Sequence, residues 1–241
     1  ASSPPRNTPT PPPGEKTLRR FLEAEPTPFR VIVHAVLVGA VVGLVAVAFF
    51  LALEAIAVGR DLLLGWAGSL PAWGWVVPVV FTAVAAQVSL LLVRALAPEA
   101  GGSGVQEIEG ALDGLRPVRW ARVIPVKFAA GLCALGGGLV LGREGPTIQL
   151  GGNLGKMVAD LFRVGAMESH MLLAAGAGAG LSAAFNAPLA GILFVMEEMR
   201  PQFRYNFLSV QSVLIATATA DVVSQTLIGR SVRSEEHTSE L

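Results

Sequence analysis

The sequence predicts an all-α, polytopic membrane protein with broken helices. Three observations carry this prediction: 52% of the 241 residues are hydrophobic, 15% are charged, and the mean hydropathy is +0.58. Soluble domains usually carry about 25% charged residues. The 27 glycines are typical of membrane helices that pack closely through small residues. The net charge is zero, whereas nucleic-acid-binding proteins usually carry an excess of basic residues. We therefore expect no nucleic-acid partner.

The N-terminal segment differs in composition from the rest of the chain. Residues 1–16 are rich in proline, serine and threonine and lack apolar side chains, which predicts a disordered tail. The absence of an apolar run there argues against a secretory signal peptide. Residues 17–25 favour a short amphipathic helix at the membrane surface.

Two long apolar segments follow, at residues 31–59 and 71–93. About 20 apolar residues cross a bilayer, so each segment predicts a membrane span. Arg60 is the one basic residue between them, whereas several basic residues flank the pair: Lys16, Arg19, Arg20, Arg30, Arg94, Arg116, Arg119, Arg122 and Lys127. Because basic residues collect on the cytoplasmic side, this distribution predicts a cytoplasmic N-terminus.

The remaining apolar segments are shorter and interrupted by glycine and proline, up to a final run at residues 205–229. Broken helices at membrane depth indicate backbone that lines a cavity or is buried in protein, and they point to a transport site. GAGAG at residues 176–180 faintly suggests a nucleotide loop, but its third glycine is misplaced for GxGxxG. Small-residue helix packing is the favoured interpretation.

The last nine residues, 233–241, are polar and acidic and start abruptly after an apolar segment. They match the in-frame translation of a common sequencing adapter, and a natural cytoplasmic tail is the alternative. We therefore assign residues 17–232 to the membrane domain. On this interpretation the protein continues beyond Val232.

Two glycine-rich motifs predict helix starts inside the apolar region. GSGVQEIEG occupies residues 102–110, and GREGPTIQLGGNLG occupies residues 142–155. A helix N-terminus offers free N–H groups and a positive dipole end to an anion, and glycine lets the anion approach the backbone. Taken alone, Ser103 fits an ordinary N-cap. Arg143 and Glu144 alone fit a local charge pair, although helical neighbours point about 100° apart.

Together with AAFNAPLAGILFVMEEMRPQFRY at residues 183–205, these motifs resemble the CLC family of chloride channels and proton/chloride antiporters, specifically its bacterial antiporters. The resemblance runs from about Arg30 to Gly229. It implies one half of an inverted-repeat fold with tilted helices, in which helix N-termini hold the ion midway. This chain departs from the family pattern at Gln106, where proline is usual.

The resemblance implies a chloride site made by Ser103, Gly104, Gly142, Glu144 and Gly145. Glu144 would be the gating glutamate, because a carboxylate is itself an anion and can occupy the backbone cage that binds chloride. Desolvation favours its protonated form, which would bring proton exchange nearer to physiological pH. Arg143 would add positive potential, and Pro146 would begin the following helix.

Two further acids, Glu197 and Glu198, end the apolar helix of the third motif. Glu198 matches the internal glutamate that passes protons toward the gate in the family's antiporters. Family channels commonly carry an apolar residue there, so Glu198 favours an antiporter over a passive channel. For Glu197, a solvated acid at the cytoplasmic boundary and a supporting role remain equally open.

The expected function is therefore proton-coupled chloride antiport in a bacterial inner membrane, by a homodimer in the full-length protein. Ion exchange needs no covalent chemistry, so we expect neither an enzyme nor a cofactor. His34 and His170 have no partners at ligand spacing, so no metal site is expected. A passive channel of the same fold is the first alternative. The other is a truncated fragment that is inactive without the second half.

Overall fold

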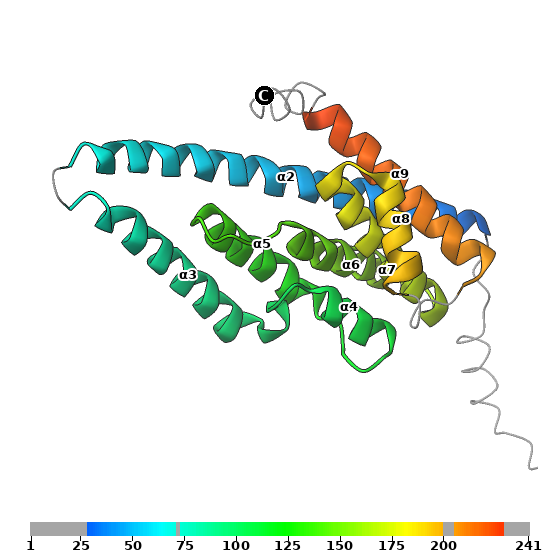
Figure 1. The fold of residues 1–241 in the computed structure, drawn as a ribbon. Helices are drawn as coiled ribbons and strands as arrows, with labels where there is room; N and C mark the ends of the chain where they lie inside the picture. The colour runs from blue at the N-terminus through cyan, green and yellow to red at the C-terminus, as the bar shows by residue number, and fades with distance from the viewer. Residues whose placement is uncertain (1–27, 71–72, 200–204, 229–241) are drawn as a thin grey trace, which may run out of the picture.

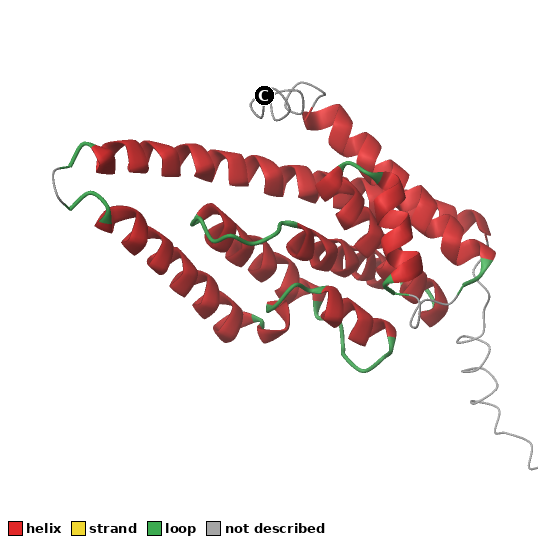
Figure 2. Cartoon of the chain, in the orientation of Figure 1, coloured by secondary structure: helices red, strands yellow, loops and turns green. Residues whose placement is uncertain are grey.

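The computed structural model describes residues 28–70, 73–199 and 205–228, and the regular elements in these ranges are all helical (Figure 1, Figure 2). This confirms the predicted all-α fold. The predicted surface helix at residues 17–25 and the segment 233–241 lie outside the described residues. The elements are α2 (Pro28–Gly68), α3 (Val76–Leu96), the short 3-10 helix η1 (Pro98–Ala100), α4 (Val105–Leu112), α5 (Trp120–Gly136), α6 (Glu144–Leu161), α7 (Ala166–Phe185), α8 (Pro188–Glu197) and α9 (Phe207–Ile228).

Helix α2 is longer than the span predicted at residues 31–59. It continues without a break for 41 residues, which is about 60 Å at 1.5 Å per residue. Neither Gly59 nor Gly65 ends it, because a single glycine weakens a helix without terminating it. A bilayer core is about 30 Å thick, so α2 must tilt strongly or project beyond it. Helices α3 and α9 are the other two described helices long and apolar enough to cross a membrane.

The centre of the described structure is the pair α6 and α7, which approach each other through backbone. A side chain added at Gly176 would collide with the backbone of Gly151, and one at Gly180 would collide with the backbone of Thr147. Residues 176–180, the GAGAG string, are all buried within α7. The packing interpretation of this string is therefore confirmed, and the nucleotide-loop interpretation is wrong.

The outer helices surround this pair unevenly. Helix α2 packs on α7 and α9, while α3 packs on α5, which in turn contacts α6. No residue of α3 is buried, although the helix is strongly apolar, so most of its surface is available to lipid or to further protein. The start of α5 lies near the end of α6, where Trp120 Nε1 donates to Asp160 Oδ2 at 3.0 Å, and the loop that follows α5 leads into the start of α6.

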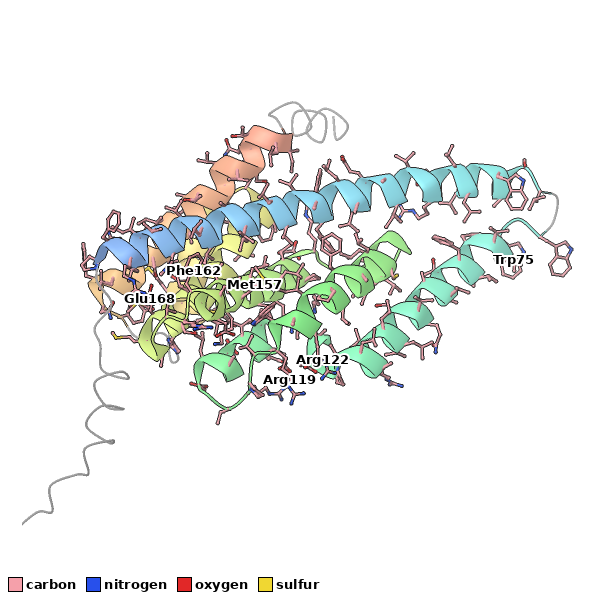
Figure 3. All side chains as sticks on the ribbon, turned by 180° about the vertical axis from the view of Figure 1, so that it is seen from behind. Trp75, Arg119, Arg122, Met157, Phe162 and Glu168 are labelled. Carbon is pink, nitrogen blue, oxygen red and sulfur yellow. The ribbon has the colours of Figure 1, made fainter. Side chains whose placement is uncertain are left out.

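A buried pair that the sequence did not predict joins α2 to α7. His34 Nδ1 lies 2.5 Å from Glu168 Oε1, and both side chains are less than one tenth exposed. The Phe162 ring lies 4.9 Å from the His34 ring. Figure 3 shows Glu168 and Phe162 near the start of α2, at the opposite end from Trp75. A single acid holds His34 here, and within the described ranges no three His, Cys, Asp or Glu side chains gather as metal ligands.

Candidate functional site: two helix N-termini at one cavity

The first part of the site is the loop before α4. Gly102 and Gly104 both have positive φ, +70° and +89°, a conformation that glycine adopts without steric cost. Gly104 is the N-cap residue and no side chain caps the helix, so the ordinary capping role considered for Ser103 is not observed. The first backbone bond runs from Ile108 N–H to Gly104 O at 3.2 Å. The three N–H groups of residues 105–107 precede this bond and point out of the helix end. Gln106 sits in a regular first turn, so the absence of proline there does not prevent the helix from starting.

The second part is the start of α6. The helix begins at Glu144, two residues earlier than the start predicted at Pro146. Proline is tolerated in a first turn because its missing N–H would have no partner there. Thr147 N–H donates to Arg143 O at 3.3 Å, and the Thr147 hydroxyl donates to Glu144 O at 2.8 Å. The N–H groups of Glu144 and Gly145 lie before the first helical bond, where an anion can accept from them.

Arg143 and Glu144 do not pair with each other. The Arg143 guanidinium lies 5.5 Å from the centroid of the Phe50 ring in a cation–π contact. The Glu144 carboxylate folds back over its own helix start, since a side chain added at Gly142 would collide with Glu144 Oε2. Among the described residues the Glu144 carboxylate has no ion-pair partner. The local charge pair is therefore wrong, and the carboxylate occupies the dipole end of α6 without a counter-cation.

The two parts touch through backbone. A Cβ added at Gly145 would lie 2.5 Å from Ser103 O and 3.0 Å from Ser103 Cα. Only glycine fits at position 145, because the Ser103 loop rests directly on the first turn of α6. The start of α4 and the start of α6 are thus adjacent. The positive ends of two helix dipoles meet at this contact.

A cavity of about 590 Å³ opens at this junction. Five of the residues singled out in the sequence line it: Ser103, Gly142, Glu144, Gly145 and Pro146. Gly104 and Arg143 lie in the same two loops but do not line the cavity. The arrangement can bind an anion through backbone N–H groups and a hydroxyl, without placing a full positive charge in direct contact with it.

Lys127 also lines this cavity, which the sequence did not predict. We expected it among the basic residues at the cytoplasmic boundary, but it is 3% exposed. Its ammonium group donates to Ala100 O at 3.0 Å and to Gly102 O at 2.8 Å. Arg94, Arg119 and Arg122 are exposed, as expected. The signal that distinguishes Lys127 is its position inside the apolar run VKFAAG, since a cation there needs buried acceptors.

Glu197 and Glu198 lie at the other end of a helix and do not line the cavity. Both side chains are exposed at the end of α8, and Glu198 N–H donates to Phe194 O at 2.9 Å. The carboxylates of Glu109 and Glu198 are close enough to repel one another, and Asp113 adds to this repulsion at Glu109. The structure therefore groups Glu198 with two acids of the α4 region.

Comparison with known proteins identifies relatives over most of the chain. The sequence profile of the family described as voltage gated chloride channel matches residues 83–238. The H(+)/Cl(-) exchange transporter ClcA of Citrobacter koseri is 53% identical over 207 residues, which are 86% of this chain and 44% of that protein. ClcA of Salmonella arizonae is 52% identical over 209 residues, with the same shares covered. The chain therefore spans less than half the length of these curated relatives.

Solved structures agree on the fold. A slow cyanobacterial Cl-/H+ antiporter superposes with a TM-score of 0.80 at 37% identity, covering 83% of this chain and 47% of that one. A eukaryotic CLC transporter superposes with a TM-score of 0.71 over 82% of this chain and 38% of its own. At 24% identity, this second likeness shows the fold alone.

Proposed function

The chain belongs to the voltage gated chloride channel family, and we propose that it forms the N-terminal half of a membrane exchanger that couples chloride movement to proton movement. The relatives named as H(+)/Cl(-) exchange transporters, at 52–53% identity, support this proposal. Because the chain spans 44% of their length, the transport activity is attributed to the full-length gene product. This chain supplies one wall of the ion site.

The observation that carries the proposal is the position of the Glu144 carboxylate. A carboxylate in an apolar protein normally finds a cation, but Glu144 has none among the described residues and lies at the N-terminus of α6. The free N–H groups and the positive dipole end of α6, where this carboxylate lies, would stabilise chloride as well. Glu144 and chloride therefore compete for the site. Protonation of Glu144 removes its charge, releases the site and links proton binding to anion binding.

Chloride would lie against the Ser103 loop on the other side of the same cavity. Ser103 is exposed and lines the cavity, and Gly104 is the N-cap of α4, whose first N–H groups are free. Gly142 leaves space that the Glu144 carboxylate fills and chloride would take in its place, and Gly145 lets the Ser103 loop lie against the start of α6. Arg143 adds positive potential from its place over Phe50, and Pro146 keeps the first turn of α6 intact. Lys127 also lines the cavity, but its ammonium group donates to two backbone carbonyls, so the anion is bound without a direct ion pair and weakly enough for turnover.

We assign proton entry to Glu198. It is exposed at the end of α8 and lies within electrostatic range of Glu109. Glu197 is equally exposed, so it serves as the natural comparison. Glu198 is also the residue that favours an exchanger over a passive channel, since family channels commonly have an apolar residue there.

The same proposal includes the membrane and the orientation. The exposed basic residues Arg94, Arg119 and Arg122 lie on the cytoplasmic side, and the α2–α3 connection lies outside. Trp73 and Trp75 beside that connection are 74% and 66% exposed, as tryptophans in an interface belt are. We place the protein in a bacterial inner membrane with a cytoplasmic N-terminus, as a homodimer.

The deciding experiment uses the complete gene product in liposomes. A chloride gradient is imposed, and external chloride and pH are recorded together. We expect chloride efflux to drive protons uphill. Glu144→Ala should give chloride leak without proton movement, and Glu198→Ala should keep chloride flux while abolishing proton movement. Glu197→Ala shows whether the neighbouring carboxylate shares that role.

Three results would contradict the proposal in different ways. Chloride flux that never drives protons uphill identifies a passive channel. Loss of both fluxes in Glu198→Ala identifies a structural residue. Residues 1–232 expressed alone should carry no chloride flux, because part of the ion site would be missing. Flux from that fragment would show that this chain is sufficient.

A further inference from the structure

We propose that Gln149 is a positioning residue that sets the distance between the Ser103 loop and Glu144. The inference rests on the proposed function, in which these two elements form the anion site. Gln149 lies in α6, four residues after Gly145, and is 1% exposed. It is therefore one helical turn below the gate and points into protein.

Gln149 holds the loop at its first residue. The amide Nε2 donates to the backbone carbonyl of Glu99 at 2.7 Å. Since Nε2 is the donor, the orientation of the amide is fixed by this bond. Glu99 is the middle residue of η1 and lies four residues before Ser103.

Gln149 also supports the loop at its last residue. A side chain added at Gly104 would lie 3.0 Å from both Cγ and Cδ of Gln149. The side chain of Gln149 thus fills the space directly beneath the Gly104 backbone, where φ is +89°. One side chain therefore contacts both ends of the six-residue loop that carries Ser103.

Lys127 contacts the same loop from a different helix. Its two bonds, to Ala100 O and Gly102 O, tie the middle of the loop to α5. Gln149 instead ties the loop to α6, the helix whose first residue is Glu144. Gln149 therefore adds to the direct contact between Ser103 and Gly145 in setting the separation between the hydroxyl of Ser103 and the carboxylate of Glu144, and Lys127 sets the position of the loop relative to α5.

The Oε1 atom of the Gln149 amide makes this residue suitable for a substitution test. Its Oε1 is buried without a hydrogen-bond partner among the described residues. It lies by a cavity of about 20 Å³ that Glu99 and Asn153 also line, which is enough room for one water. Replacing the amide by an apolar group removes this unsatisfied acceptor together with the donor, so the loss of stability is partly offset.

The variant is Gln149→Met, which keeps the length of the side chain and removes the donor. Its matched control is Asn153→Leu, one turn further along α6. Asn153 is 3% exposed, donates to Gln149 O at 2.8 Å and lines the same small cavity. It contributes no hydrogen bond to the loop of residues 99–104. The two variants therefore remove equivalent buried amides, and one of them holds the loop.

The measurement is chloride affinity of the full-length protein by calorimetry, together with the chloride dependence of transport in liposomes. We expect Gln149→Met to weaken chloride binding about fivefold, the effect of one neutral hydrogen bond. Turnover at saturating chloride should change little. Asn153→Leu should bind chloride within about twofold of the unmodified protein, which lies below the effect of one such bond.

The outcomes separate this inference from the proposed function. If the unmodified protein neither binds chloride nor couples it to protons, the proposed function fails. If the unmodified protein is coupled and Gln149→Met binds chloride normally, the positioning role alone is overturned. Equal weakening in Gln149→Met and Asn153→Leu would assign both amides to general stability of α6 and would also overturn it.

Discussion

Replacing Gly145 with alanine tests directly whether the contact between the Ser103 loop and α6 builds the ion site. The new Cβ would lie 2.5 Å from Ser103 O and 3.1 Å from Ser103 C. Both are backbone atoms and cannot rotate away. Restoring an ordinary contact requires the loop to move by about 0.9 Å away from the helix. Overpacking of this kind costs about 1–3 kcal/mol of stability.

The same movement of the loop predicts how much the affinity for chloride falls. Hydrogen bonds weaken steeply once donor and acceptor are separated by about 3.5 Å. A displacement of about 0.9 Å would take the Ser103 hydroxyl beyond reach of an ion held at the start of α6. A hydrogen bond to a charged group contributes about 1.5–3 kcal/mol, so chloride should bind about 10- to 100-fold more weakly.

The assay is calorimetric titration of chloride into the purified full-length protein, with Gly59→Ala as the control. Gly59 is inside α2, and nothing lies within 4 Å of an added Cβ. The control should bind chloride normally and should be slightly more stable, because alanine favours helix over glycine by up to about 1 kcal/mol. If Gly145→Ala binds chloride as tightly as Gly59→Ala, the contact between the two helix starts does not set the site.

Three further substitutions test the surroundings of the site, each by thermal unfolding of the full-length protein in detergent. Lys127→Met leaves the carbonyls of buried Ala100 and exposed Gly102 without their donor and should cost about 1–3 kcal/mol; unchanged stability would mean that the ammonium group does not hold the loop. Gly176→Ala forces a Cβ into the Gly151 backbone and should cost at least about 1–3 kcal/mol, so a neutral effect would contradict backbone contact between α6 and α7. His34→Ala leaves Glu168 buried and unpaired and should cost about 3–5 kcal/mol; the double variant with Glu168→Ala should recover part of this loss, and additive losses would show that the pair is not coupled.

The sequence predicted the helices well because the signals for them are local. Apolar runs and the start of a helix at GREGP depend on neighbours in the chain, and both are observed. The ends of the helices were predicted less accurately. Helix α2 runs past the predicted span because glycine alone does not end a helix, and α6 starts before Pro146 because proline tolerates several positions in a first turn.

The contacts across the fold could not be predicted, because they depend on which helix faces meet. His34 and Glu168 are 134 residues apart in the chain, and nothing near either residue indicates the other. Lys127 follows a run of arginines, and charge counting treats it as one of them, although α5 carries it into the interior. In the sequence, Gln149 looks like any polar residue of a helix, and its role depends on the loop that folds over it. Of the predicted site, Ser103, Gly142, Glu144 and Gly145 do meet at one cavity. Their chemical roles await the transport assays.

The packing of α6 limits how the proposed gate can work. Gly151 of α6 lies against the backbone of Gly176, and Thr147 lies against the backbone of Gly180, with no side chains between these backbones to rearrange. Sliding or rotating α6 would separate these contacts along its whole buried face, and packed interfaces of this kind do not deform gradually. The Glu144 side chain, by contrast, is half-buried, borders a cavity of about 590 Å³ and has no ion-pair partner among the described residues. We therefore expect gating to be a rotation of this one side chain about a fixed helix. The proposed anion site between the Ser103 loop and α6 would stay in place while chloride and carboxylate exchange within it.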